Sequence, residues 1–423
     1  ASNITSKVSP FMDPHLIVLL LDFLSQKEIF AKEEVLAAKL NVLGKTALVD
    51  QQTEVYKSLG KDPSEDHDTR SKKVTENLNS LESNCSTLLA WIKDNSEEIE
   101  KLKKEKKFSA SVLESRHNIK PEEVQGLYKY AKAQYESGAY QSASDNLSHY
   151  LALQSKEEDS SSEVLSATWG KLAADILAKN WDAAKAGVTS LKELIDSGKF
   201  GKPIEQLQQR SWLLHWSLFV YFNEQSNSNE FVELCFQTNY LNAIQTTSPH
   251  LLRYLAFAVI TNTENRRRSD VENLVDALGR EQSNYQDPIT NFLNSLLVDF
   301  DFDSAQEKVK ACSEVLSQDY FLNDKQEAFV ESARLFIFET YCRIHKCVDI
   351  QMLADKLAMQ DKEEAELWIA NLIRNAKLDA KIDSATGKVI MSTKSSSVYE
   401  QVLEKTKSLH FQSNQLASCL LQE

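Results

Sequence analysis

The amino-acid sequence predicts an all-α protein: a helical-hairpin solenoid similar to tetratricopeptide repeats, followed by a winged-helix module and a C-terminal helix. The first indication is that only 10 of the 423 residues are Gly and 7 are Pro, about 4% together where average usage gives roughly 12%. An all-β fold is excluded, because its many tight turns need Gly, Asn or Asp at positive φ. A repeated aromatic–alanine pattern and a strand hairpin near the C-terminus complete the prediction.

Prolines mark the beginnings of three predicted helices. Asp13-Pro14, Lys120-Pro121 and Asp287-Pro288 each place Pro before a segment with apolar helical periodicity, at a position whose N–H would have no partner within the helix. Polar runs without apolar periodicity predict the loops between helices. These runs are Lys61–Lys73, Ser155–Glu163, Lys199–Pro203 and Asn223–Glu230.

A weak internal repeat predicts the solenoid. The pattern aromatic-x2-Ala-x3-apolar-x2-apolar occurs from Tyr140 to Tyr150, from Trp181 to Leu191 and from Phe302 to Cys312. The small Ala lets a neighbouring helix approach closely while the ring covers the junction, so consecutive helices are expected to stack as antiparallel pairs. The spacing of the first two copies lies in the range of helix-hairpin repeats.

The pattern changes after residue 325 and predicts a winged helix. A long helix, Gln326–His345, leads through the strand-like Cys347–Ile350 to helices at Met352–Met359 and from near Lys362. Two runs that alternate apolar with polar residues, Leu378–Ile382 and Lys388–Met391, then flank the turn residues Ser384–Gly387 and predict a hairpin. Beyond it, a final helix carries an apolar stripe made of Val398, Val402, Leu409, Leu416 and Leu420.

Five segments follow from these patterns. They are a flexible N-terminus (1–12), N-terminal helical repeats (13–205), further helices that lead into the winged helix (206–325), the winged helix itself (326–394) and the C-terminal helix (395–423).

Charge, hydropathy and cysteine usage restrict the partners. The net charge of −14 disfavours tight nucleic-acid binding by the free chain, because phosphates are bound mainly by Lys and Arg. The longest apolar run, Leu16–Leu21, is far shorter than the roughly 18 residues that a membrane span needs. We therefore expect no membrane partner and no secretory signal. The 6 cysteines have no framework spacing, so we expect reduced thiols inside the cell.

Motifs for catalysis and ligand binding are incomplete. Gly44-Lys45-Thr46 resembles the end of a phosphate-binding loop, but Lys39 stands where that loop needs Gly. Cys342, His345 and Cys347 offer too few ligands for a structural zinc site, and core packing explains them better. His215, on an aromatic helix, is expected to be a neutral core residue bonded to a backbone carbonyl. We predict no enzyme, no catalytic or metal-binding residue and no cofactor.

Two further features bear on nucleic acid. Arg266-Arg267-Arg268 has acidic neighbours and is interpreted as a solvated loop rather than an RNA-binding or nuclear-targeting motif. The third helix of the predicted winged helix opens with Glu363, Glu364 and Glu366, which would repel phosphates where a DNA reader carries Arg or Lys. The winged helix is therefore expected to contact protein.

The architecture resembles the PCI family, the scaffold subunits of the proteasome lid, the signalosome and translation initiation factor 3. Four strings are similar to the e-type members of the initiation factor: Trp212–Phe219, Tyr240–Gln245, Arg334–Thr340 and Trp368–Ala376. The resemblance as a whole runs from about Asp13 to Leu409. Residues Ala1–Met12 and a longer polar loop at Ser155–Glu163 depart from that pattern. The resemblance implies a non-catalytic scaffold subunit of initiation factor 3.

The resemblance also implies partners and contact residues. Family subunits join side by side through their winged helices and gather their terminal helices into a bundle, so the expected partners are other PCI-type subunits and, through the complex, the 40S ribosomal subunit. The implied interface comprises Lys381, Ile382, Val389, Ile390 and Met391 in the wing, and Val402, Leu409, Leu416 and Leu420 in the bundle helix. We expect a cytoplasmic protein, with a nuclear pool left open. A proteasome-lid or signalosome subunit is the alternative, followed by direct nucleic-acid binding and an unrecognised enzyme.

Overall fold

The computed structural model describes most of the chain. The described residues are 5–60, 65–95, 121–154, 162–197, 202–223, 228–263, 267–345, 347–349, 380–383, 388–391 and 398–420. They divide into two compact units. Unit 1 comprises Ala1–Asn291 and Ala311–Phe329, and unit 2 comprises Phe292–Lys310 and Val330–Glu423.

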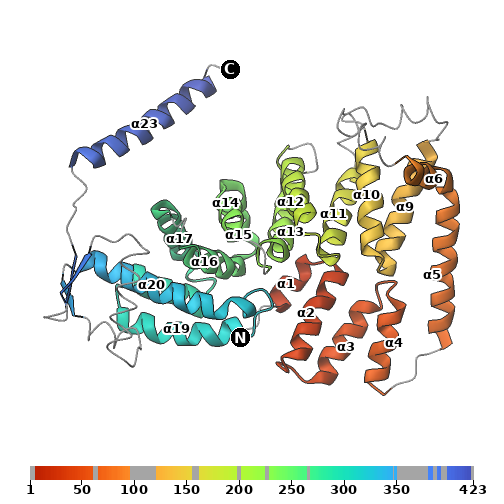
Figure 1. Ribbon diagram of the computed structural model, residues 1–423, viewed down its shortest axis with the longest axis horizontal. Coiled ribbons are helices and arrows are strands. Elements are labelled where there is room, and N and C mark those ends of the chain that lie inside the picture. The colour runs from red at the N-terminus through yellow and green to blue at the C-terminus, as the bar shows by residue number, and fades with distance from the viewer. Residues whose placement is uncertain are drawn as a thin grey trace. The chain divides into compact units, whose positions relative to one another are not determined.

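Unit 1 begins with a group of helices at the N-terminal end of the chain, drawn from red to orange in Figure 1. They are α1 (Thr5–Val8), η1 (Ser9–Phe11), α2 (Pro14–Gln26), α3 (Lys32–Leu43), α4 (Val49–Ser58), α5 (Glu65–Asn84) and α6 (Ser86–Asp94). The N-cap residue Asp13 accepts a hydrogen bond from the backbone N–H of His15 at 2.9 Å, which confirms the predicted start of α2 at Pro14. The N-terminal segment that we expected to be flexible holds α1 and η1 and buries Val8 and Met12.

A stack of longer helices follows in the same unit. Its members are α9 (Pro121–Ser137), α10 (Tyr140–Leu153), α11 (Ser162–Leu177), α12 (Trp181–Asp196) and α13 (Pro203–Tyr221). Each packs on the next, as Figure 1 shows from yellow to green. This arrangement confirms the predicted helical-hairpin solenoid. The prediction for Lys61–Lys73 was wrong from Glu65 onward, because the charged helix α5 begins there and packs against α9.

The aromatic–alanine repeat corresponds to helix starts. Tyr140, Trp181 and Phe302 are the first residues of α10, α12 and α19 (Phe302–Ser317), and Ala143, Ala184 and Ala305 are each 0% exposed. A Cβ at these positions fills the space where a neighbouring helix approaches, so a larger side chain would separate the helices.

Each repeat helix is preceded by a residue with positive φ. Gly138, Lys179 and Phe300 lie two residues before the helix start and have φ values of 96°, 60° and 54°. At Gly138 the N–H of Ala139 bonds to the carbonyl of Gln134, and at Lys179 the N–H of Asn180 bonds to the carbonyl of Asp175, both at 2.9 Å. This six-to-one bond is the one that closes a helix with a left-handed residue.

The remaining helices of unit 1 surround a core rich in aromatic residues. They are α14 (Asn229–Cys235), α15 (Thr238–Thr247), η2 (Pro249–Leu251), α16 (Leu252–Thr261), α17 (Arg268–Glu281) and η3 (Asn323–Lys325). The guanidinium of Arg253, 1% exposed, contacts Asp287 and lies 3.2 Å from the carboxylate of Asp319. Tyr254 donates to the same Asp319 carboxylate at 3.0 Å. Burial opposes the charge of Arg253, but the surrounding carboxylates raise its pKa, so this buried cation stays charged.

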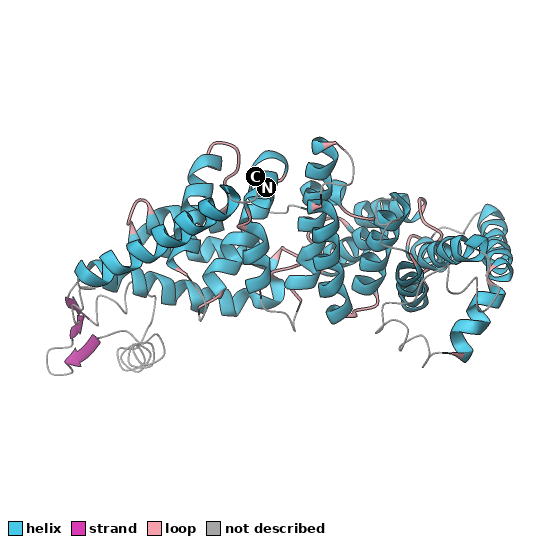
Figure 2. Ribbon diagram, turned by 90° about the horizontal axis from the view of Figure 1, so that it is seen from above, coloured by secondary structure: helices cyan, strands magenta, loops and turns pink. Residues whose placement is uncertain are grey.

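Three further helices, a small sheet and the terminal helix complete the chain. Those not yet bounded are α18 (Pro288–Leu297), α20 (Gln326–Ile344) and α23 (Val398–Leu420). The strands β1 (Cys347–Asp349), β2 (Ala380–Asp383) and β3 (Lys388–Met391) form an antiparallel sheet in the order β1-β3-β2, shown in magenta in Figure 2. Helix, strand and hairpin thus occur in the predicted order. The predicted helices at Met352–Met359 and from Lys362 lie outside the described residues.

Candidate protein-interaction sites

The hairpin β2–β3 is the first predicted contact surface. Ile390 lies opposite Cys347 on one neighbouring strand and Lys381 on the other, and it is 48% exposed. Val389, its neighbour in the chain, is 0% exposed. Because successive side chains of a strand point to opposite faces, Val389 belongs to the core of the sheet and Ile390 to its outer face. For Lys381, Ile382 and Met391 the structure describes strand pairing only.

The terminal helix α23 is the second predicted contact surface. Its described apolar side chains are largely exposed: Val402 by 58%, Leu403 by 55%, Leu409 by 65% and Phe411 by 70%. Val402 and Leu409 are seven residues apart and share one face, whereas Phe411 lies about 200° around the helix from Leu409. The side chains of Leu416 and Leu420, the other members of the predicted stripe, lie outside the described part.

Cys342, His345 and Cys347 do not form a ligand set. Cys342 is buried and Cys347 is exposed, and the ring of His345 packs against Tyr341 with centroids 4.2 Å apart. Burial raises the pKa of the Cys342 thiol to about 12, with Glu339 adding to the rise. Among the described residues, no group of three or more His, Cys, Asp or Glu side chains is placed to hold a metal.

His215 forms a buried pair with His250. Its Nδ1 lies 2.6 Å from the carbonyl oxygen of Ser211, as the sequence predicted, and its Nε2 lies 2.8 Å from Nε2 of His250. Because the carbonyl can only accept, Nδ1 of His215 carries the proton and His250 donates between the rings. Phe11 stacks on His215 at 4.2 Å. Sequence reasoning missed His250, which lies in another segment with no distinguishing motif.

The arginine cluster is paired with acids where it is described. Arg267 lies 3.6 Å from Glu233, and Arg268 lies 2.8 Å from Glu272, all four side chains being exposed. Neighbouring carboxylates weaken any attraction for phosphate, in line with the interpretation of a solvated loop. Arg266, like Glu363, Glu364 and Glu366, lies outside the described residues.

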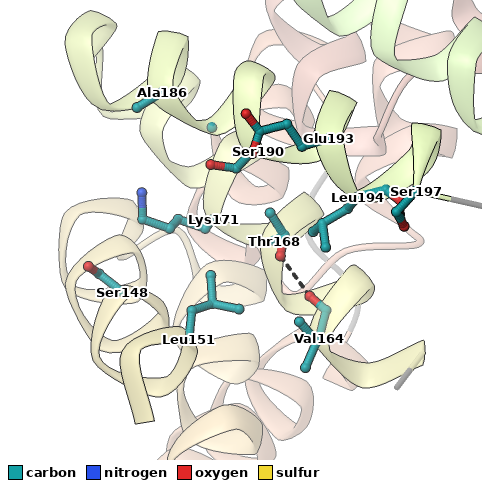
Figure 3. Close-up of a pocket in the computed structure, with 11 residues that line it drawn as sticks. Ser148, Leu151, Val164, Thr168, Lys171, Ala186, Ser190, Glu193, Leu194 and Ser197 are labelled. Atoms are coloured by element: carbon teal, nitrogen blue, oxygen red, sulfur yellow. Dashed lines mark hydrogen bonds between the residues drawn. The ribbon is translucent and has the colours of Figure 1, made fainter. Parts of the chain in front are cut away.

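A cavity of about 470 Å³ lies between α10, α11 and α12 (Figure 3). Some of its polar side chains are engaged within the chain. Thr168 donates to the carbonyl of Val164 at 2.7 Å, the bond drawn dashed in Figure 3, and Lys171 lies 3.1 Å from the buried Asp175.

A larger cavity, of about 590 Å³, was missed by sequence reasoning. We call it the aromatic cavity, because residues of α2, α9, α11 and α13 line it with the rings of Tyr128, Tyr135, Trp169, Trp212 and Trp216. The ring of Trp169 meets Trp216 and Trp212 edge to face, with centroids 4.7 and 6.3 Å apart. Only the helical spacing of Trp212 and Trp216 pointed to such a cluster, and Trp169 comes from another helix.

Comparisons with known proteins cover almost the whole chain. Residues 3–134 match the family described as eIF3 subunit 6 N-terminal domain, and residues 309–393 match the PCI domain family. The chain is 40% identical over 433 residues to the E subunit of eukaryotic translation initiation factor 3 from Arabidopsis thaliana, covering 99% of this chain and 96% of that relative.

Two further relatives are E subunits of the same factor. The protein of Bombyx mori is 41% identical, covering 98% of this chain and 94% of its own length. The protein of Yarrowia lipolytica is 38% identical, with 98% of both chains covered. These similarities confirm the PCI resemblance and do not favour a proteasome-lid or signalosome subunit. The chain belongs to the family formed by the E subunits of eukaryotic translation initiation factor 3.

Proposed function

We propose that this chain is a non-catalytic scaffold subunit of translation initiation factor 3. In this role it joins neighbouring PCI-type subunits through the hairpin β2–β3 and the helix α23, and it supports assembly on the 40S ribosomal subunit in the cytoplasm. The observation that carries the proposal is the exposed apolar stripe of α23, on which Val402 and Leu409 are 58% and 65% exposed. An apolar stripe on a helix is stabilised when a partner helix covers it.

The free energy available from this stripe is modest for one residue and large for several. Full burial of one Val or Leu stabilises by about 1.5–3 kcal/mol, so covering the exposed parts of Val402 and Leu409 contributes about 2–4 kcal/mol together. That corresponds to a loss of about 30-fold to 1,000-fold in affinity when both are made polar. Ile390 in the wing adds a third exposed apolar side chain.

Further support comes from the described part of the chain. No helix there is both long and apolar enough to cross a membrane. The acidic composition, with a net charge of −14, favours contacts to protein over direct binding of nucleic acid.

The test is incorporation of a double variant, Val402→Asp with Leu409→Asp, into the complex. The tagged full-length chain is expressed in cells, and co-purified subunits and 40S proteins are quantified by mass spectrometry. The double variant should lose its partners while its thermal midpoint stays unchanged. Phe411→Asp is the matched control, because it adds a charge at a site that is 70% exposed but lies off the stripe.

Three results would contradict the proposal. One is normal recovery of initiation-factor subunits with the double variant. Another is a lowered melting temperature of the isolated chain, which would mean that the stripe packs within its own chain. Recovery of proteasome or signalosome subunits in place of initiation-factor subunits would also reject it.

A further inference from the structure

The aromatic cavity has no part in the proposed assembly through β2–β3 and α23. Its volume of about 590 Å³ lies within the range of roughly 300–1,000 Å³ found for ligand sites. All its lining residues belong to unit 1. The question is which chemistry of ligand its walls and rim would accept.

Most polar groups on the aromatic walls are already bonded. Trp169 donates through Nε1 to Gln209 Oε1 at 2.7 Å, and Trp216 donates to the carbonyl of Phe11 at 3.0 Å. Tyr135 donates to the carboxylate of Asp13 at 2.7 Å. These bonds fix the orientations of three rings, so the walls are formed before any ligand arrives.

Trp212 is the exception among these rings. It is half-buried in the cavity wall, and its indole N–H makes no hydrogen bond to any described residue. Lys45 and Lys132, exposed at the rim, likewise make no ion pair within the described part. The cavity therefore presents three unused donors, of which two carry positive charge.

Two acceptor atoms of the lining, in contrast, are already occupied. Asp13 accepts from Tyr135 and from the backbone of His15, and Gln209 Oε1 accepts from Trp169. Glu136, one turn from Lys132 on α9, is the acidic side chain left at the rim. A ligand that uses the three free donors must bring acceptors, and a negative charge on it would meet the two lysines.

We propose that the aromatic cavity binds a proline-rich segment of a partner protein in the polyproline II conformation, with an acidic residue that pairs with Lys45 or Lys132. Proline supplies a carbonyl acceptor without an N–H, and its ring packs flat against aromatic side chains. In this conformation three residues complete one turn, so every third proline ring of the ligand lies on the same face of the segment. These rings would pack against the side chains of Trp169 and Trp212. The indole N–H of Trp212 donates to a ligand carbonyl.

The test measures binding of a labelled peptide to the purified full-length chain by fluorescence anisotropy. The probe is a ten-residue polyproline peptide in which two inner residues are Glu, and the comparison peptides carry Lys or Ala at those positions. The Glu peptide should bind most tightly. Its advantage over the Ala peptide should shrink as salt is raised, because the lysines are exposed and screened.

Two variants separate the roles of the ring and of the rim. Trp212→Phe keeps an aromatic wall but removes the donor, and should weaken binding of all peptides by about tenfold. Lys45→Glu with Lys132→Glu should reverse the preference, so that the Lys peptide binds better than the Glu peptide. Trp181→Phe, in a half-buried tryptophan of α12 outside the cavity, is the matched control and should change nothing.

Circular dichroism of each variant establishes that the fold is retained. The proposal is overturned by an absence of saturable binding to the unmodified chain, by equal binding of a proline-free peptide with the same charge, or by affinity that Trp212→Phe leaves unchanged. None of these outcomes bears on the proposed assembly function, because that function is tested by substitutions in the apolar stripe of α23.

Discussion

Acidification should weaken the region around His215 and His250, because both rings are buried in the neutral form. Burial lowers the pKa of His215 to about 4, although its bond to the Ser211 carbonyl opposes the shift. Burial also lowers the pKa of His250, to about 3, and repulsion from a protonated His215 and from the cations Lys7 and Arg253 adds to the shift. Adding a proton to each ring would also place two N–H donors face to face at 2.8 Å.

The magnitude follows from linkage between protonation and unfolding. In the unfolded chain a histidine has a pKa of about 6.5, so between that pH and the folded value the unfolded state binds more protons. The contribution of the two neutral histidines to the free energy of unfolding is therefore fully present above about pH 6.5, and it falls as the pH drops toward about 4. At pH 5 each ring loses about 2 kcal/mol, or about 4 kcal/mol for the pair. That is a large fraction of a typical stability of about 5–15 kcal/mol.

Hydrogen exchange followed by mass spectrometry gives the local unfolding free energy of α13 and α16. Between pH 6 and pH 5 this free energy should fall by about 2 kcal/mol, after correction for the intrinsic exchange rate. In the variant His250→Asn one titrating ring is gone and an amide donor replaces it, so the fall should be about half as large. Carboxylates common to both proteins cancel in this comparison.

A fall that is the same size in both proteins would refute the reasoning. So would a stability of α13 that rises on acidification, because that sign requires a histidine whose pKa is raised by folding. A direct proton titration of the two imidazoles offers a second check, since neither should become protonated in the folded chain above about pH 5.

Three further predictions concern the core, the turns and metal. Arg253→Met leaves Asp287 and Asp319 buried without their cation, so the free energy of unfolding should fall by about 3–5 kcal/mol. An unchanged midpoint in thermal unfolding would contradict this prediction. Adding Asp287→Asn and Asp319→Asn to the variant should restore part of the lost stability. Gly138→Ala should destabilise by about 1–3 kcal/mol, because φ is 96° and the new Cβ would lie 2.9 Å from Leu48. Lys179→Gly at the matching turn should change the free energy of unfolding, measured with a chemical denaturant, by less than about 1 kcal/mol. Equal losses in both variants would show that the positive φ is not what makes Gly138 sensitive. Metal analysis of the purified chain should find no stoichiometric zinc, and a chelator should leave the thermal midpoint in place; a lowered midpoint would indicate a metal site that includes residues beyond Cys342 and His345.

The sequence contained the information for the helical architecture because its signals are local. Proline at the first helical position, the N-cap Asp13 and the aromatic–alanine spacing act within a few residues, and the observed helices begin where these signals stand. The charged helix α5 was missed since its apolar residues are sparse, and its packing against α9 supplies what the pattern lacks.

Contacts between distant segments had no such signal. His215 was correctly interpreted as a core residue bonded to a carbonyl, but its partner His250 comes from η2. Arg253 stands inside an apolar run, which indicates a buried ion pair without naming Asp287 or Asp319. In the wing, alternation predicted a strand but not which face is covered, because a shift by one residue exchanges the faces.

The recurring left-handed residue before α10, α12 and α19 has a consequence for how this chain tolerates change. Gly138, Lys179 and Phe300 differ completely in side chain and share a positive φ. The reversal of direction is therefore set by the main chain, and the exposed surfaces of the hairpins are free to vary without disturbing it. A protein that contacts several neighbours at once can in this way acquire new contact residues on its helices while the arrangement of those helices stays the same.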